Sequence, residues 1–392
     1  MSNNQLNVYS QRINEIEPFR VMALLAQVRA LEAEGRDIVH MEIGEPDFPT
    51  PEPVTRAAMV AIEKEEMHYT PALGLPQLRD LVAAFYQQRY DLQISSQRIV
   101  ITPGASGALL LALGVLLDTG DKIMMADPGY PCNRNFVRFL GGEPQVVNVD
   151  AKTDYQLTAA QVEQHWDAQT RGLMLASPSN PTGTLISDQA LADITAMVVQ
   201  KKGRLIVDEI YHGLTYSEKT RPRSALSFSD DTFIINSFSK YFGMTGWRLG
   251  WLVAPENAID NINKLAQNLF LAASTPAQYA ALAAFSPENF QILEQRRQQF
   301  QQRRDYLLPA LRELGFDLPV TPEGAFYLYA GCEKFTDDSF VFAQTLLNEA
   351  GVAVTPGRDF GDNQPEKFLR FSYTTSMARL EEGVRRLQAF VV

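Results

Sequence analysis

Short apolar runs alternate with helical stretches through the middle of the chain, and a polar or glycine-containing loop follows each run. Short runs without polar alternation are typical of strands that are covered on both faces, as in parallel sheets. The runs are Ile99–Ile101, Ile123–Ala126, Leu173–Ala176, Leu205–Val207, Phe233–Ile235 and Leu249–Val253. Because helical stretches alternate with these runs, the pattern predicts an α/β fold with a mostly parallel central sheet flanked by helices.

The pattern changes near Pro287, where a long polar helix begins. The segments that follow predict a second, smaller α+β domain. They are the apolar run Phe326–Tyr329, a helix over Ser339–Ala350, and strands over Val352–Val354 and Phe368–Ser372. We expect the helix predicted over Phe19–Glu34 to belong to this smaller domain. The predicted division is a large domain at 45–286 and a discontinuous small domain at 1–44 plus 287–392.

One stretch approaches the length of a membrane span, because no charged residue lies between Arg98 and Asp118. Thr102-Pro103-Gly104 divides it, so we interpret it as a buried strand, a turn and a buried helix from Ala105 to Leu117. The chain begins Met-Ser-Asn-Asn-Gln-Leu, which lacks the apolar segment of a signal peptide. We therefore expect no association with a membrane.

The composition of the 392 residues is that of an ordinary globular protein, with 45% hydrophobic and 21% charged residues. There are 35 Lys and Arg residues against 46 Asp and Glu, which gives a formal net charge of −11. This balance argues against nucleic acid as a partner, since binding phosphates requires clustered Lys and Arg. Cys132 and Cys332 are the only cysteines, too few for a disulfide framework. We expect a reducing, cytoplasmic location.

Two residues that follow predicted strands have unusual surroundings. Lys240 lies among apolar and small residues, and a desolvated lysine has a lowered pKa and can attack an aldehyde. Asp208 directly follows the buried run Leu205–Val207, which is unfavourable unless a cation or a donor meets the carboxylate. A helix N-cap is an interpretation of Asp208 with equal weight.

Other strand ends carry groups suited to a phosphate or a ring. The turn Thr102–Gly107 opens a helix whose N–H groups can bind a phosphate, although such a joint needs small residues in any case. Tyr130 could present its ring to a ligand, although a structural role in a turn is more common. Asn180 offers an amide in a loop that two prolines make rigid. Ligands of open α/β sheets bind at these carboxyl ends of strands, so we expect the groups to meet there.

Pyridoxal 5′-phosphate is a ligand that needs all of these groups together. Its aldehyde needs a lysine, and its phosphate needs a helix N-terminus, here with Arg248. Its pyridine nitrogen needs an anion, and its phenolate oxygen needs hydrogen-bond donors. We therefore predict this cofactor. We predict no metal, because the histidines lack the spacing of metal ligands; they are His40, His68, His165 and His212.

With these residues the sequence resembles the class I/II aminotransferases, which are fold-type-I pyridoxal-phosphate enzymes. The resemblance runs from about Phe19 to the C-terminus, and its most specific part is Ser237–Lys240 followed by Gly246–Gly250. The other matching motifs are Gly44–Phe48, Tyr69–Gly74, Asn180–Gly183, Asp208–Tyr211, Glu323–Tyr327 and Leu369–Ser372. The resemblance implies the fold-type-I architecture.

The resemblance implies catalytic roles for three residues. Lys240 would form the internal Schiff base and move a proton between the substrate Cα and the cofactor C4′. Asp208 would pair with the pyridinium nitrogen and keep the ring able to accept electrons. Tyr211 would hydrogen-bond the phenolate oxygen together with Asn180.

The resemblance also implies residues that bind the rest of the cofactor and the substrate. Tyr130 would stack on the ring, and Arg370 would clamp the substrate α-carboxylate as a planar fork. The implied phosphate ligands are Ala105, Ser106, Ser237 and Arg248, and the implied helpers of Arg370 are the Gly44 backbone and the Asn180 amide. Tyr69 would reach the phosphate of the partner subunit, which implies a homodimer with shared active sites.

The predicted activity moves an amino group between an L-amino acid and a 2-oxo acid. The alternative is a lyase on the same scaffold, of the C–S β-lyase or aminocyclopropane-carboxylate-synthase type, because the same residues serve both reactions. A regulatory module is disfavoured, since only about 40 residues precede the core and they carry no basic patch. Phe19, Arg20 and Val21–Leu25 are candidates for the substrate mouth, although Arg20 could equally be a surface charge.

Overall fold

A computed structural model describes residues 9–18, 20–217 and 221–391. Its centre is a seven-stranded sheet of order β2-β8-β7-β6-β5-β3-β4. The strands are β2 (Ile99–Thr102), β3 (Lys122–Asp127), β4 (Glu143–Asn148), β5 (Thr170–Ala176), β6 (Arg204–Asp208), β7 (Phe233–Ser237) and β8 (Gly250–Val253). All neighbouring strands pair in parallel except at β8, which is antiparallel to both β2 and β7. The predicted mostly parallel α/β sheet is confirmed.

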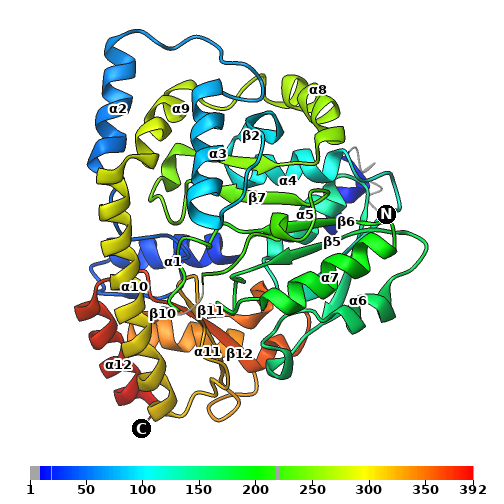
Figure 1. The fold of residues 1–392 in the computed structure, drawn as a ribbon. Helices are drawn as coiled ribbons and strands as arrows, with labels where there is room; N and C mark the ends of the chain where they lie inside the picture. The colour runs from blue at the N-terminus through cyan, green and yellow to red at the C-terminus, as the bar shows by residue number, and fades with distance from the viewer. Residues whose placement is uncertain (1–8, 19, 218–220, 392) are drawn as a thin grey trace, which may run out of the picture.

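Helices cover both faces of this sheet (Figure 1). One face packs on α4 (Gly104–Gly114), α5 (Pro131–Phe139) and α8 (Ile259–Leu269). The other face packs on α3 (Pro76–Tyr90), α6 (Ala159–His165), α7 (Asp188–Gln200) and α9 (Thr275–Leu282), with α2 (Glu52–Glu63) packed on α9. Successive residues of one strand enter opposite cores: Leu205 and Val207 enter one, and Ile206 enters the other. Burial on both faces explains why these strands lack polar alternation.

The uncharged stretch after Arg98 folds as β2 and α4, a fully buried strand followed by a largely buried helix, as the Thr102–Gly104 turn predicts. In the described part of the chain, no helix is long and apolar enough to cross a membrane.

The C-terminal part forms a smaller layer below the sheet in Figure 1, and α10 (Pro287–Leu314) runs along both parts. Its three-stranded antiparallel sheet has the order β11-β12-β9. The elements are β9 (Tyr327–Gly331), α11 (Ser339–Thr345) with a π-helical turn at Leu346–Ala350, β10 (Val352–Ala353), β11 (Thr355–Pro356), β12 (Phe368–Ser372) and α12 (Met377–Val391).

The N-terminal segment joins this smaller layer. Strand β1 (Val39–His40) pairs in parallel with β10. Helix α1 (Arg20–Ala33) buries Leu24 and Val28 in a cluster with Leu347 of the π-helical turn. These contacts are those that a discontinuous small domain requires, and the boundaries at 44/45 and 286/287 stay a prediction.

Candidate active site

The parallel strands β5, β6 and β7 bring their carboxyl ends to one edge of the sheet, where the predicted residues lie. Asp208 is the last residue of β6 and Ser237 the last of β7. Asn180 follows β5, in a loop whose Ser177 N–H donates to the Asp208 carbonyl at 3.1 Å. The topology therefore places side chains distant in sequence around one point.

Lys240 lies in the turn after β7, and its Nζ donates to the Gly44 carbonyl at 2.7 Å. The Nζ is also 5.9 Å from the centre of the Tyr211 ring and 5.7 Å from that of Phe326. Burial lowers the pKa of Lys240 to about 8, although the nearby Glu45 carboxylate favours the charged form. The turn therefore holds an amine that is more easily deprotonated than a surface lysine.

Asp208 is only 7% exposed, and its Oδ1 accepts a hydrogen bond from the Ile210 N–H at 3.0 Å. A turn follows β6 here, with no regular helix, so the N-cap interpretation of Asp208 is wrong. Burial raises the pKa of Asp208 to about 7, against the Ile210 hydrogen bond and the Lys240 charge, which favour ionisation. A cationic ligand would stabilise the ionised carboxylate.

Arg370 is almost fully buried on β12, the central strand of the small sheet. Its Nη1 donates to Asn180 Oδ1 at 3.0 Å, and its Nη2 donates to the Glu42 carbonyl and to Thr355 Oγ1 at 3.3 Å. The Nε has no hydrogen-bond partner among the described residues. The guanidinium lies over the Tyr327 ring at 4.4 Å. These contacts hold the planar guanidinium in one orientation beside Asn180 and Tyr327.

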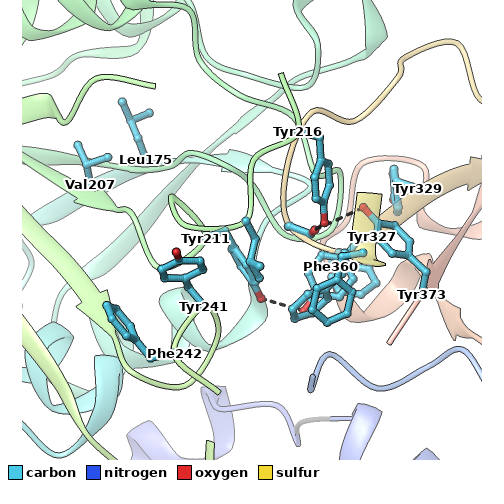
Figure 2. Close-up of a cluster of buried hydrophobic side chains, with 14 of the residues drawn as sticks. Leu175, Val207, Tyr211, Tyr216, Tyr241, Phe242, Tyr327, Tyr329, Phe360 and Tyr373 are labelled. Atoms are coloured by element: carbon cyan, nitrogen blue, oxygen red, sulfur yellow. Dashed lines mark hydrogen bonds between the residues drawn. The ribbon is translucent and has the colours of Figure 1, made fainter. Parts of the chain in front are cut away.

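Tyr211 lies beside this arginine and joins the two parts of the site. Its hydroxyl makes a 2.8 Å hydrogen bond with the hydroxyl of Tyr327, drawn in Figure 2. The two rings pack edge to face, with their centres 5.8 Å apart. Tyr211 thus connects the turn after β6 with β9 of the small sheet.

The residues of the predicted phosphate site lie at a tight crossing of backbones. A Cβ on Gly250 would lie 2.7 Å from the Gly104 carbonyl carbon and 2.9 Å from the Ala105 nitrogen, so only glycine lets β8 approach the start of α4. Arg248 adopts a left-handed conformation, with φ +52°, and its Nη2 would be 2.8 Å from a Cβ on Gly104. The structure therefore places Arg248 beside the N-terminus of α4.

Three other predicted phosphate and ring residues have different surroundings. Ser106 is exposed in the first turn of α4, whereas the buried Ser237 accepts a hydrogen bond from the Ser239 N–H at 3.0 Å. Tyr130 is partly buried after β3, and the Gly129 N–H donates to the Phe360 carbonyl at 2.8 Å, which fixes this turn against the small layer.

Tyr69 lies on the segment between α2 and α3, and its side chain is 84% exposed. A cavity of about 540 Å³ beside it is lined by this segment, the loop between α8 and α9, and the start of α9. None of the residues that line it belongs to the group around Lys240. Within one chain, therefore, the structure does not bring Tyr69 to the other predicted residues.

Sequence reasoning missed several residues around Arg370. Glu42 and Thr355 contribute acceptors, and Phe360 packs its ring 4.8 Å from the guanidinium. Asp359 is 6% exposed, with the charges of Arg370 and Arg20 nearby, and burial raises its pKa to about 6. Of these residues, only Tyr327 could have been found from the sequence, because it lies in the matching motif Glu323–Tyr327. The others become neighbours of Arg370 only when the chain folds.

Arg20 begins the first turn of α1, beside a cavity of about 480 Å³ that Asp359 and Phe360 also line. Its guanidinium is 3.6 Å from the Glu17 carboxylate, and both side chains are exposed. Phe19, also a candidate for the substrate mouth, lies outside the described residues.

Comparison with known proteins adds independent findings. The family model for aminotransferase class I and II matches residues 36–387. The chain is 38% identical to the valine–pyruvate aminotransferase of Mycobacterium tuberculosis, over 96% of this chain and 97% of that protein. It is 36% identical to the (5-formylfuran-3-yl)methyl phosphate transaminase of Methanocaldococcus jannaschii, over 97% and 99% of the two chains.

A solved structure is equally similar. The crystal structure of an aminotransferase from Mycobacterium tuberculosis superposes with a TM-score of 0.95 at 37% identity and covers 98% of each chain. The fold-type-I architecture predicted from the resemblance is thereby confirmed. The chain belongs to the class I and II aminotransferase family and is a transaminase.

Proposed function

We propose that this transaminase uses pyridoxal 5′-phosphate, held covalently by Lys240, to move an amino group between an L-amino acid and a 2-oxo acid. The observation that carries the proposal is a lysine of lowered pKa and a buried, partly compensated carboxylate at one edge of the sheet, with the Arg370 fork nearby. The names of the relatives support amino acid and oxo acid substrates in general.

The residues present fit this cofactor. Asp208 is a buried acceptor that needs a cation, and a protonated ring nitrogen supplies one. The crossing of Gly250 with Gly104 and Ala105 leaves backbone N–H groups and Arg248 for a phosphate. Ser106, Ser237, Tyr130, Asn180 and Tyr211 are the proposed remaining ligands.

When bound, the cofactor supplies a ring that absorbs the electrons left on the substrate Cα after its proton is removed. The chain's own residues supply orientation and proton transfer. Arg370 and the Asn180 amide bind the α-carboxylate, which fixes the Cα–H bond relative to the ring. Lys240, at a pKa of about 8, has roughly a tenth of its amine neutral at pH 7, so it can accept that proton and return it.

A half-reaction screen tests the proposed activity. Purified protein with bound cofactor is mixed with each amino acid in turn, and the visible absorbance and the products are followed. Transamination produces a 2-oxo acid, and after an acceptor is added, a new amino acid. Ammonia and pyruvate formed without an acceptor would instead identify the lyase alternative. No spectral change with any amino acid would refute both.

We also propose a homodimer in which Tyr69 completes the site of the partner subunit. Its ring is 84% exposed, and several apolar side chains that lie close to it in the chain, or flank Phe270 at the cavity beside it, are exposed too. They are Ile62, Met67, Leu269 and Leu271. The free thiols of Cys132 and Cys332 fit the proposed cytoplasmic location.

Mixing two inactive variants, Tyr69→Ala and Lys240→Ala, tests the shared site. A hybrid dimer would have one site with both changes and one with neither. After random exchange of equal amounts, about a quarter of all sites would be intact, and activity should recover to about that fraction. No recovery after proven subunit exchange would mean that each chain forms its site alone.

A further inference from the structure

Tyr327 has no role in the proposed function so far, yet its hydroxyl lies at the centre of the site. The residue begins β9 and is 1% exposed. Its hydroxyl is 2.8 Å from the Tyr211 hydroxyl, and its ring lies under the Arg370 guanidinium at 4.4 Å. Figure 2 shows the two phenols pointing toward each other from different elements.

The hydroxyl of Tyr327 also lies against the segment that contacts Lys240. A Cβ on Gly44 would lie 2.1 Å from this oxygen, so the Gly44 backbone and the phenol are in direct contact. The Gly44 carbonyl accepts the hydrogen bond from Lys240 Nζ. Tyr327 therefore contacts Tyr211 and Arg370 directly and reaches Lys240 through Gly44.

The direction of the Tyr211–Tyr327 hydrogen bond decides whether Tyr211 can donate its hydroxyl proton to a ligand. Each phenol has one proton, so in this bond one hydroxyl donates and the other accepts. If Tyr211 donates to Tyr327, its proton is no longer available for another acceptor. If Tyr327 donates, Tyr211 keeps its proton for a ligand.

We propose that Tyr327 is a positioning residue that donates its proton to Tyr211 and so reserves the Tyr211 proton for the phenolate oxygen of the cofactor, an inference that rests on the proposed function. Among the described residues, Tyr211 provides the one hydrogen bond of the Tyr327 hydroxyl, so this donor has a single acceptor. A phenol that accepts a hydrogen bond also becomes a stronger donor, because hydrogen bonds in a chain polarise one another.

Acidity favours this direction, since the more acidic of two phenols is the better donor. Burial raises the pKa of both residues, and the Arg370 charge opposes the effect at both; it is second only to burial at Tyr327 but the weakest influence at Tyr211. At Tyr211 burial raises the pKa well above its usual value, and the neighbouring Tyr327 and the Asp208 charge add to it. The charged groups that face this pair are Asp208 from β6, Lys240 from the turn after β7, and Arg370 from β12.

The Tyr327→Phe variant tests the direction, because it keeps the ring under Arg370 and removes only the hydroxyl. The readout is the pH midpoint of the visible absorbance of the bound cofactor. A hydrogen bond to the phenolate oxygen stabilises that anion and lowers the midpoint. Loss of the Tyr327 donor should therefore raise the midpoint, by about half a pH unit. If Tyr327 were the acceptor, its loss would free the Tyr211 proton and the midpoint would fall.

Two further variants make the result specific. Tyr373→Phe is the matched control: Tyr373 is also fully buried, and its hydroxyl donates to the Ala325 carbonyl at 3.4 Å, away from Tyr211. It should leave the midpoint unchanged. In a Tyr211→Phe background, adding Tyr327→Phe should produce no further shift. An equal shift in the control, or an undiminished shift without Tyr211, would overturn the inference.

A second measurement covers failure of Tyr327→Phe to fold. Incorporation of 4-aminophenylalanine at position 327 keeps an N–H donor of similar size but a much poorer acceptor than the phenol. A donating Tyr327 should then leave the midpoint unchanged or slightly raised, and a fall would contradict the proposal. Failure of the unmodified protein to bind pyridoxal phosphate would refute the proposed function as well. Normal binding with an unmoved or reversed midpoint in Tyr327→Phe would refute the inference alone.

Discussion

The pKa values of ionisable side chains shift in opposite directions at the candidate active site and at the surface cluster of Asp37, Arg379, Glu382 and Arg386. In the cluster, Asp37 pairs with Arg379 at 2.7 Å and with Arg386, and these arginines lower its pKa to about 2. Glu382 pairs with Arg385 and Arg386, and its pKa falls to about 2 as well. At the site, burial raises the pKa of Asp208 to about 7 and lowers that of Lys240 to about 8.

The comparison shows where the folded protein stabilises the ionised form of a side chain and where it destabilises that form. At the surface cluster each charge meets an opposite one in water, so ionisation is favourable in the folded state. In the site, burial opposes ionisation of Asp208 and Lys240, and the protein alone compensates it only in part. A ligand with complementary charges would complete the compensation.

The largest effect is expected for Lys240→Ala. Loss of the amine should remove covalent attachment of the cofactor and lower the rate by about 10⁴-fold, roughly 5.5 kcal/mol of barrier. Borohydride reduction of the unmodified protein, followed by peptide mass mapping, should find the pyridoxyl group on Lys240. Attachment to a different lysine would contradict the assignment.

Asp208→Asn should lower the rate about 100-fold, roughly 2.7 kcal/mol, because the neutral amide cannot hold a protonated ring nitrogen.

The same substitution should stabilise the folded protein against unfolding when the cofactor is absent. The pKa of Asp208 is higher in the folded protein, about 7, than in the unfolded chain. The folded state then binds more protons, so stability falls as pH rises from about 4 to 7.

An asparagine at position 208 does not ionise, so the variant does not lose stability as the pH rises. Cofactor-free Asp208→Asn should therefore be more stable than the unmodified chain by about 4 kcal/mol at pH 8, and the difference should vanish below pH 4. Thermal unfolding at both pH values measures it. A variant that is less stable at pH 8 would show that Asp208 is already compensated by the protein.

Arg370→Lys should raise the KM for amino acids about 30-fold, roughly 2 kcal/mol, because an ammonium cannot form the two parallel hydrogen bonds of a guanidinium. Cofactor affinity should be unchanged, which titration with pyridoxal phosphate can check. Unaltered half-reaction kinetics with every amino acid would remove Arg370 from the substrate site.

The smallest effect is expected for Asp37→Asn in the surface cluster. Activity should be unchanged, and the Tm should fall slightly at pH 7. Because the folded pKa of Asp37 is lowered to about 2, its stabilisation is present above pH 4 and is lost as pH falls toward 2. The difference in Tm should shrink over that range and also in high salt. A change in rate would mean that the cluster influences the site.

Several features of the fold could be predicted from the sequence because a local pattern of residues specifies them. The predicted apolar runs became β2, β3 and β5–β8, since strands buried on both faces have no polar positions. Strand β4 was missed because it lies at the sheet edge, where Glu143 and Asn148 are exposed and the apolar signal is weak. The antiparallel direction of β8 was also not predicted, since strand direction depends on how the chain returns to the sheet.

By itself, the sequence determined the family, the α/β layers and the group of residues that end the strands, because glycine turns, apolar runs and the Lys240 and Asp208 motifs are local and chemically specific. Only the tertiary structure decided the partners of those residues. The Glu42 carbonyl beside Arg370, the Tyr327 hydroxyl beside Tyr211 and the Asp359 charge near both Arg370 and Arg20 join segments far apart in the chain. Such contacts arise from packing of the small layer against the sheet edge, and no local pattern records them.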